Sequence, residues 1–267
     1  MTVKHPFAST CLGFCLSTFA ALSSAGVPDP ALADEIADPE ATGGTILLQA
    51  DFNALPLDTP IGQGGAAAGQ PFEVPSLLSA IVRNSAFPTP SLDIGWAGDP
   101  ITAATVRFSF LGEQEVTDGL VDIRIDLVPG SWSQYNVYLR EHGGAARSYS
   151  TITLGGSGGM TISDAAGQAT SVGGIWSPGS LVKLHWRYDM DQRIYTLWVN
   201  DVPRVTDRAF GVAPDGRGIG GLLVGMAWNT PTNSLISVDN IDVRRIDDVI
   251  FADSFEPASP TASGSQH

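Results

Sequence analysis

The stretch LVKLHWRYDMDQRIYTLWVNDV, residues 181–202, alternates apolar and polar side chains on both sides of a short polar turn. Alternation with a period of two is typical of half-buried β-strands, so the stretch predicts an antiparallel hairpin. A three-residue loop, Met190 to Gln192, places Asp189 opposite Arg193 and gathers the apolar side chains on one face. In this register the buried face carries Val182, Leu184, Trp186, Tyr188, Ile194, Thr196 and Trp198.

The opposite face of this hairpin carries side chains that can form hydrogen bonds. Its members are Lys183, His185, Arg187 and Asp189 on one strand and Arg193, Tyr195, Leu197 and Val199 on the other. One interpretation is cross-strand pairing, Asp189 with Arg193 and Arg187 over Tyr195, each pair contributing less than about 1 kcal/mol. The other is a ligand surface, because a flat ring beside hydrogen-bond donors can stack on a sugar and bind its hydroxyl groups.

Similar alternation recurs between Thr45 and Ile246, and no segment carries a helical apolar stripe of ten residues. In LVDIRIDLV, residues 120–128, apolar side chains alternate with Asp122, Arg124 and Asp126. Many short strands without helices predict an all-β protein built from two packed antiparallel sheets. The other strand-like runs are TILLQADF, TVRFSF, SQYNVYLR, STITL, GGLLVGMAW and ISVDNIDVRR.

Residues 120–140 predict a second polar face like that of the first hairpin. Pairing these residues as a hairpin sets Asp122 opposite Arg140, Arg124 opposite Tyr138 and Asp126 opposite Asn136. Salt pairs explain most of these positions, and Tyr138 with Arg124 joins the candidate ligand contacts.

The first 25 residues predict a secretory signal peptide, because a weakly basic start precedes the apolar run CLGFCLSTFAAL, which is too short to span a bilayer. Cleavage after Ala25 is preferred to cleavage after Ala33. Either site removes Cys11 and Cys15, the two cysteines of the chain, and so excludes disulfides and thiol chemistry from the mature protein. The expected location is the periplasm, the cell surface or the medium.

The remaining chain divides into three parts by composition. Residues 26–44 are rich in proline and acid and predict a disordered leader. Residues 45–246 predict one β-sandwich domain, and residues 247–267 a C-terminal motif with a flexible tail. No later apolar stretch has the length of a membrane helix. The 28 acidic residues against 14 basic ones give a net charge of −14, which argues against nucleic acid and anionic lipid as partners.

Few residues have the spacing of a catalytic or metal-binding motif. The internal histidines His142 and His185 form no zinc-binding pair, and no nucleophile elbow occurs. Asp122 and Asp126 lie four residues apart on one strand face, and two carboxyl groups are what glycoside hydrolysis requires. Arg124 lies between them, so pairing of charges is the alternative.

Asp239 shares the strand phase of Ile241 and Val243, so the alternation predicts that its carboxylate points toward the core. An inward carboxylate is costly unless it is paired or bound to a metal. A calcium ion with oxygens from near Asp51 and Asn53 would satisfy it. A bulge at the strand end, which releases the side chain to solvent or to backbone N–H groups, is the alternative.

The segments ADFN, WSPGSLVKLHWRYDMDQRIYTLWVNDV and SVDNIDVRR together resemble the laminin-G-like, concanavalin A-like jelly rolls of exported bacterial proteins. The resemblance covers roughly Thr45 to Ile246. That family includes lectin-like modules, laminarinase-type hydrolases and alginate-type lyases. The strand motifs of the hydrolases and lyases do not occur here, so the resemblance implies glycan binding without catalysis. It also implies a structural calcium at the first and last strands, matching Asp51 and Asp239.

Residues 250–256, IFADSFE, are similar to a terminal FxDGFE motif on exported proteins of some Gram-negative bacteria, with Ser254 in place of glycine. The similarity implies sorting or surface display. Packing of Ile250, Phe251 and Phe255 onto the sandwich is the alternative.

Three functions remain open. The first is a secreted, non-catalytic module that binds a glycan or another cell-surface component. The second is a polysaccharide hydrolase or lyase that uses Asp122 and Asp126. The third is a structural surface or matrix protein. For the first, the candidate ligand contacts are Tyr195, Arg187, His185, Tyr138 and Arg124.

Overall fold

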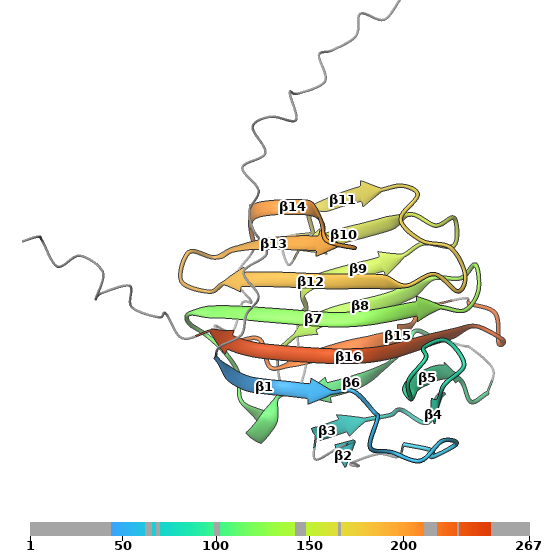
Figure 1. The fold of residues 1–267 in the computed structure, drawn as a ribbon. Helices are drawn as coiled ribbons and strands as arrows, with labels where there is room; N and C mark the ends of the chain where they lie inside the picture. Colours follow the sequence, from blue (N-terminus) through green and yellow to red (C-terminus); the bar gives the residue numbers. More distant parts are fainter. Residues whose placement is uncertain are drawn as a thin grey trace, which may run out of the picture. The chain divides into compact units, whose positions relative to one another are not determined.

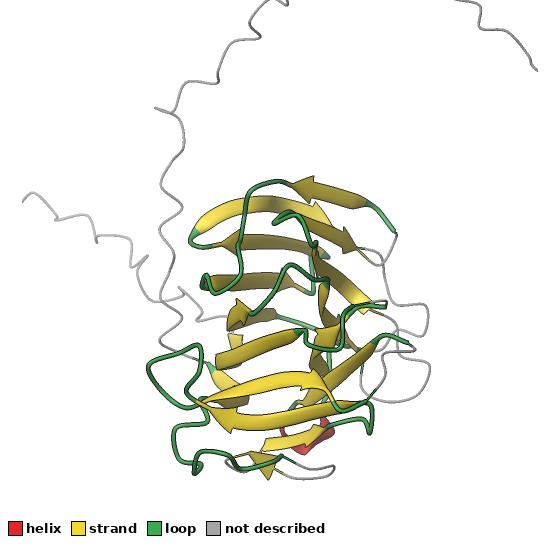
Figure 2. Cartoon of the chain, turned by 90° about the vertical axis from the view of Figure 1, so that its right-hand side faces the viewer, coloured by secondary structure: helices red, strands yellow, loops and turns green. Residues whose placement is uncertain are grey.

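Two antiparallel β-sheets packed on one another form the domain in the computed structural model (Figures 1 and 2). The structure describes residues 44–61, 66–67, 70–98, 102–141, 148–164, 167–210, 218–228 and 230–246. This architecture confirms the predicted all-β sandwich of the jelly-roll type. The predicted signal peptide, the leader up to residue 43 and the IFADSFE motif lie outside the described residues.

Each sheet has eight strands. The order in the first sheet is β14 (Val202–Ala209), β13 (Ile194–Val199), β12 (Val182–Asp189), β7 (Leu120–Pro129), β16 (Leu235–Ile246), β5 (Ser91–Trp96) and β4 (Leu78–Arg83), and β1 (Thr45–Ala50) also pairs with β16. The order in the second sheet is β11 (Ala169–Val172), β10 (Met160–Asp164), β9 (Ser148–Leu154), β8 (Tyr135–Arg140), β15 (Gly221–Met226), β6 (Ala104–Ser109), β3 (Gln70–Glu73) and β2 (Ala66–Ala67).

The core lies between the sheets and follows the predicted alternation. On β7 the apolar side chains are buried in the core, while Asp122, Arg124 and Asp126 lie on the other face. Each fully buried large apolar side chain contributes about 1.5–3 kcal/mol. The buried apolar residues of β7 are Val121, Ile123, Ile125 and Leu127.

Among the described residues, no helix has both the length and the hydropathy to cross a lipid bilayer.

The hairpin of β12 and β13 exists, but the predicted register is wrong by one residue. Asp189 pairs with Ile194, so the loop has four residues, Met190 to Arg193. Two features explain the longer loop: Asp189 Oδ1 accepts a hydrogen bond from the Gln192 backbone N–H at 2.7 Å, and Arg193 adopts a left-handed φ of 59°. The predicted pair of Asp189 with Arg193 is therefore absent.

This shift exchanges the two faces of β13. Tyr195 stacks on Tyr188 inside the sandwich, with ring centroids 5.2 Å apart, and is 1% exposed. Trp198 lies on the outer face instead, whereas Trp186 is in the core as predicted. The predictions that Tyr195 is an outer ligand contact and that Trp198 is core are therefore wrong. Burial of Leu197 and Val199, both 0% exposed, favours the observed register.

The predicted hairpin of residues 120–140 is also wrong, because the two strands belong to different sheets. β7 pairs with β12 and β16, and β8 pairs with β9 and β15. Residues 130–134 therefore carry the chain from the first sheet to the second. The connection from β15 to β16 returns it to the first sheet, and the two crossovers lie side by side: Gly130 N–H bonds to Leu235 O at 2.8 Å and Ala227 N–H to Gln134 O at 3.1 Å.

Candidate functional site

The outer face of the first sheet carries a cluster of charged side chains, called the charged ladder here. Asp122 lies at its centre and is 3% exposed. Its carboxylate is 2.7 Å from His185 Nε2, accepts a hydrogen bond from Arg124 Nε at 3.0 Å and lies 3.4 Å from an Arg187 NH2 nitrogen. The ladder consists of Asp122, Arg124, His185, Arg187, Asp242 and Arg244.

Opposing effects act on the pKa of Asp122. Burial raises the pKa of this carboxyl, but the hydrogen bonds and charges of His185 and Arg124 outweigh burial, so the net pKa is lowered. The neighbouring Asp242 forms two hydrogen bonds with Arg244, at 2.7 and 2.9 Å, and raises the pKa of that guanidinium. Each carboxylate of the ladder thus has at least one cationic partner.

The structure brings three of the candidate ligand contacts, Arg124, His185 and Arg187, together on Asp122 instead of around an open cleft. Tyr138 is not part of the group, because β8 belongs to the second sheet, where Tyr138 pairs with Thr151 and Leu223. Burial raises the pKa of the Tyr138 hydroxyl, although Arg140 partly offsets it. These positions indicate a structural role for the ladder more than a ligand surface.

Asp239 lies on the opposite face from the predicted one. The register of β16 on β7 shifts between Asp239 and Asp242, and Asn240 at the bulge has a φ of 49°. Asp239 therefore pairs with Asp126 and shares a face with Ser237 instead of with the core residues beyond the bulge. It is nevertheless 0% exposed, since the bends between β4 and β5 contact it there: Thr89 Oγ1 donates to Asp239 Oδ2 at 3.1 Å.

The other carboxylate oxygen of Asp239, Oδ1, is buried without a hydrogen-bond partner. The pKa of this carboxyl is raised, mainly by burial. The negative charges of Asp126 and Asp51 also raise it, while hydrogen bonds from the Asn240 backbone and from Thr89 lower it in part. A buried, unpaired oxygen near other carboxylates fits a hard cation such as calcium.

Calcium takes six to eight oxygen ligands. Within the part of the chain that the structure describes, no three histidine, cysteine, aspartate or glutamate side chains form a set that could hold a metal. Asp51 is exposed, and its Oδ1 accepts a hydrogen bond from the Asn53 backbone at 3.2 Å. Carbonyl oxygens or waters would therefore have to supply most of the calcium ligands.

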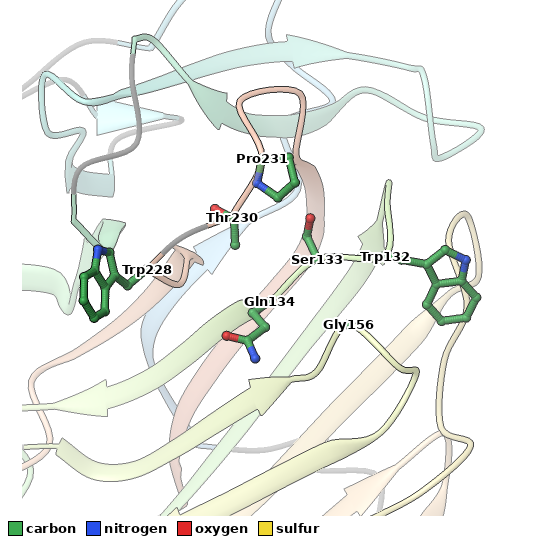
Figure 3. Close-up of a pocket in the computed structure, with 7 residues that line it drawn as sticks. All are labelled: Trp132, Ser133, Gln134, Gly156, Trp228, Thr230 and Pro231. Atoms are coloured by element: carbon green, nitrogen blue, oxygen red, sulfur yellow. The ribbon is translucent and has the colours of Figure 1, made fainter. Parts of the chain in front are cut away.

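A pocket of about 500 Å³ lies where the two crossovers meet and is called the tryptophan pocket here. Its two indoles are the most exposed large apolar side chains described: Trp132 is 56% and Trp228 64% exposed. They stand at opposite ends of the pocket, with the polar lining between them (Figure 3). The lining residues are Trp132, Ser133, Gln134, Gly156, Trp228, Thr230 and Pro231.

Trp132 packs against the segment between β11 and β12, next to the turn between β9 and β10. Its ring packs on the buried Trp176, with centroids 5.3 Å apart, and Trp176 Nε1 donates to Gly159 O at 3.1 Å. Gly158 allows this contact, because it has a φ of 82° and an added Cβ would lie 2.6 Å from Trp176 O and 3.2 Å from the Trp132 ring. One ring face of Trp132 is thereby fixed in place.

Buried hydroxyl groups support the pocket floor. Ser133 Oγ lies 2.7 Å from Ser234 Oγ, a contact that joins the two crossovers. Thr230 Oγ1 accepts a hydrogen bond from Trp96 Nε1 at 2.9 Å. The Gln134 side chain is exposed and has no hydrogen bond to another described residue. Gln134 is therefore the lining side chain with a free donor and a free acceptor.

Sequence reasoning missed Trp132, Gln134 and Trp228. The signal that could have found them is local: PGSWSQ and MAWNTP place a tryptophan among glycine, serine, asparagine, threonine and proline, which are turn residues. Turn segments run over the surface, so an indole within one is exposed unless another segment covers it.

No family model matches the sequence, and no curated protein matches it. Solved structures do resemble the fold. A sialidase has a TM-score of 0.53 at 12% identity, over 77% of this chain and 19% of that one. The catalytic domain of a GH131 β-glucanase from Podospora anserina has a TM-score of 0.50 at 13% identity, over 76% of this chain and 97% of that one.

A Trypanosoma rangeli sialidase in complex with 2,3-difluorosialic acid has a TM-score of 0.50 at 11% identity, over 75% of this chain and 31% of that one. This chain therefore spans less than a third of either sialidase. At such identities the likeness shows the β-sandwich fold alone.

Proposed function

We propose that this domain is a non-catalytic β-sandwich module that binds a glycan in the tryptophan pocket. The observation that carries the proposal is the pair of exposed indoles, Trp132 and Trp228, at the two ends of that pocket. Exposed apolar surface around a concave site with polar groups is the usual mark of ligand binding. An indole offers a rigid apolar face to a sugar ring, and the amide of Gln134 can bind sugar hydroxyl groups.

Binding is favoured over catalysis by the chemistry of the lining. Glycoside hydrolysis requires two carboxyl groups beside the scissile bond, and none of the lining residues that the structure describes has one. The carboxylates considered from the sequence lie on another face. Asp122 is held by Arg124, Arg187 and His185, and Asp126 accepts a hydrogen bond from the Asn240 amide at 2.9 Å.

The test is binding of the full chain to a panel of soluble polysaccharides, with product release assayed in the same samples. We expect saturable binding without product, weakened by Trp228→Ala and unchanged by Val202→Ala, which removes an exposed apolar side chain of the edge strand β14. Product release that is lost in Asp126→Asn would instead establish a hydrolase or lyase. A folded protein that binds no member of the panel would favour a structural surface protein.

We also propose export and a structural calcium. The apolar run in residues 11–22 supports export, which N-terminal sequencing of protein recovered from culture medium and periplasm would check. The unpaired oxygen of Asp239 supports calcium, with Asp51 as the second carboxylate. The ion would neutralise the buried carboxylate and join β16 to the end of β1, without a part in ligand chemistry.

A further inference from the structure

The described lining of the tryptophan pocket contains no ionisable side chain. It combines two indoles, one amide, two hydroxyls, a glycine and a proline. The hydroxyls of Ser133 and Thr230 already take part in hydrogen bonds within the protein. The seven described lining residues thus offer apolar faces and an amide, and none of them offers a counter-ion.

An anionic sugar would be bound poorly by such a lining. A carboxylate or sulfate that leaves water needs a cationic partner, most often a bidentate arginine. The arginines of the charged ladder are on the outer face of the first sheet and are engaged with Asp122 and Asp242. The net charge of −14 also repels anionic chains at long range.

We infer that the pocket selects neutral oligosaccharides and rejects anionic ones such as uronates. This inference rests on the proposed function, since it names the ligand class of the same site. The indoles stand at opposite ends of the pocket, so a chain of several sugar units satisfies both better than a monosaccharide (Figure 3). The apolar faces of separate sugar rings pack on Trp132 and Trp228, and hydroxyl groups between them bind the Gln134 amide.

The experiment is calorimetric titration of the full chain with two sets of probes. The neutral set is cellohexaose, laminarihexaose, xylohexaose and mannohexaose, with glucose as the short control. The anionic set is hexagalacturonate and an alginate hexamer. We expect binding within the neutral set only, at least about tenfold tighter for the best hexamer than for glucose. We also expect the affinity to stay constant between about 0.05 and about 0.5 M NaCl, since salt screens only charged interactions.

Variants connect the binding to the pocket. Trp228→Ala and Gln134→Ala should each weaken the best neutral ligand about tenfold or more, while Val202→Ala should not change it. Circular dichroism of each variant confirms that it is folded. The mild Trp228→Phe variant should keep most of the affinity, because it retains an aromatic face.

The outcomes separate the two proposals. Binding of an anionic hexamer that Trp228→Ala weakens would overturn the neutral specificity and leave glycan binding at this pocket intact. Binding that neither Trp228→Ala nor Gln134→Ala weakens would overturn the pocket as the site. A folded protein that binds no probe of either set would overturn both proposals together.

Discussion

The imidazole of His185 stacks on the indole of Trp198, with ring centroids 4.7 Å apart and an interplanar angle of 21°. The two residues are a direct cross-strand pair on the outer face of β12 and β13. His185 Nε2 lies 2.7 Å from Asp122 Oδ1, so the ring is fixed both by its face and by its edge. The contacts of His185 are therefore made with neighbouring strands of the same sheet, and they stabilise that sheet.

Removing the charge of Asp122 should destabilise the protein strongly. Asp122→Asn leaves two arginines and His185, with side chains between 11% and 34% exposed, around a neutral amide. We expect a loss of about 2–4 kcal/mol in the free energy of unfolding. This is slightly less than the loss of about 3–5 kcal/mol that is usual when one partner of a buried ion pair is removed, because these partners keep some contact with water. Urea unfolding at neutral pH measures it.

Asp242→Asn is the matched control for that experiment. It removes the charge that Arg244 pairs with through two hydrogen bonds on the same face. The side chains of Asp242 and Arg244 are more exposed than that of Asp122, at 25% and 23%. We expect this variant to lose only about 0–1 kcal/mol. Equal losses for the two variants would contradict the central position of Asp122 in the ladder.

The same carboxylate predicts a pH dependence of stability. The pKa of Asp122 is lower in the folded protein than the ordinary value of 3.8, because His185 and Arg124 outweigh burial. Its contribution is therefore present above about pH 4 and is lost as the pH falls through the folded pKa. The difference in stability between the native protein and Asp122→Asn should shrink in acid. A difference that stays constant from neutral to acid pH would refute this sign.

Tyr195 should matter for stability and not for binding. Its ring is 1% exposed and stacks on Tyr188 in the core. Tyr195→Ala should lose about 3–5 kcal/mol, as other large-to-small core changes do. The affinity of the remaining folded protein for the best neutral oligosaccharide should be unchanged. Thermal unfolding and titration of the same sample check both parts, and weaker binding by folded Tyr195→Ala would contradict the observed register.

The two exposed indoles should differ in their effect on stability. Trp228→Ala removes a largely exposed side chain and should change stability by no more than about 0.5 kcal/mol. Trp132→Ala also removes the contact with Trp176, which contributes about 0.5–1.5 kcal/mol. Both variants should weaken ligand binding. Denaturant unfolding distinguishes them, and identical stabilities would mean that the Trp132 contact contributes nothing.

Calcium should raise the melting temperature of the native protein but not that of Asp239→Asn. The reason is that the buried Oδ1 of Asp239 gains a partner only when the ion is bound. Without calcium, Asp239→Asn should be the more stable protein, because burying an unpaired carboxylate is costly. Thermal scans in calcium and in EDTA measure both effects. Native protein that melts equally in the two buffers would exclude the ion.

The strands could be predicted from the sequence because period-two alternation depends only on neighbouring residues. The β7 face with Val121 and Ile123 inside is an example. The register of β13 could not be predicted from the sequence, because it depends on Arg193 adopting a left-handed backbone conformation. Arginine has no strong preference for that conformation. The bulge at Asn240 similarly reversed the face expected for Asp239.

Sheet membership was the larger difficulty. Residues 120–129 and 133–140 alternate equally well as partners or as members of opposite sheets, so local pattern cannot choose between them. The choice is made by tertiary packing, which also creates the tryptophan pocket. Trp132 and Trp228 are far apart in the sequence, and the pairing of β8 with β15 and of β7 with β16 brings their loops together.

Both loops that carry these indoles pass from one layer of the sandwich to the other, and the contact between Ser133 and Ser234 joins them. An oligosaccharide bound in the pocket would therefore contact both loops at the point where they cross between the two sheets. The two sheets could then separate only after the oligosaccharide had dissociated. Bound oligosaccharide should thus slow amide hydrogen exchange in β7 and β8 together, in strands that the sugar itself does not reach.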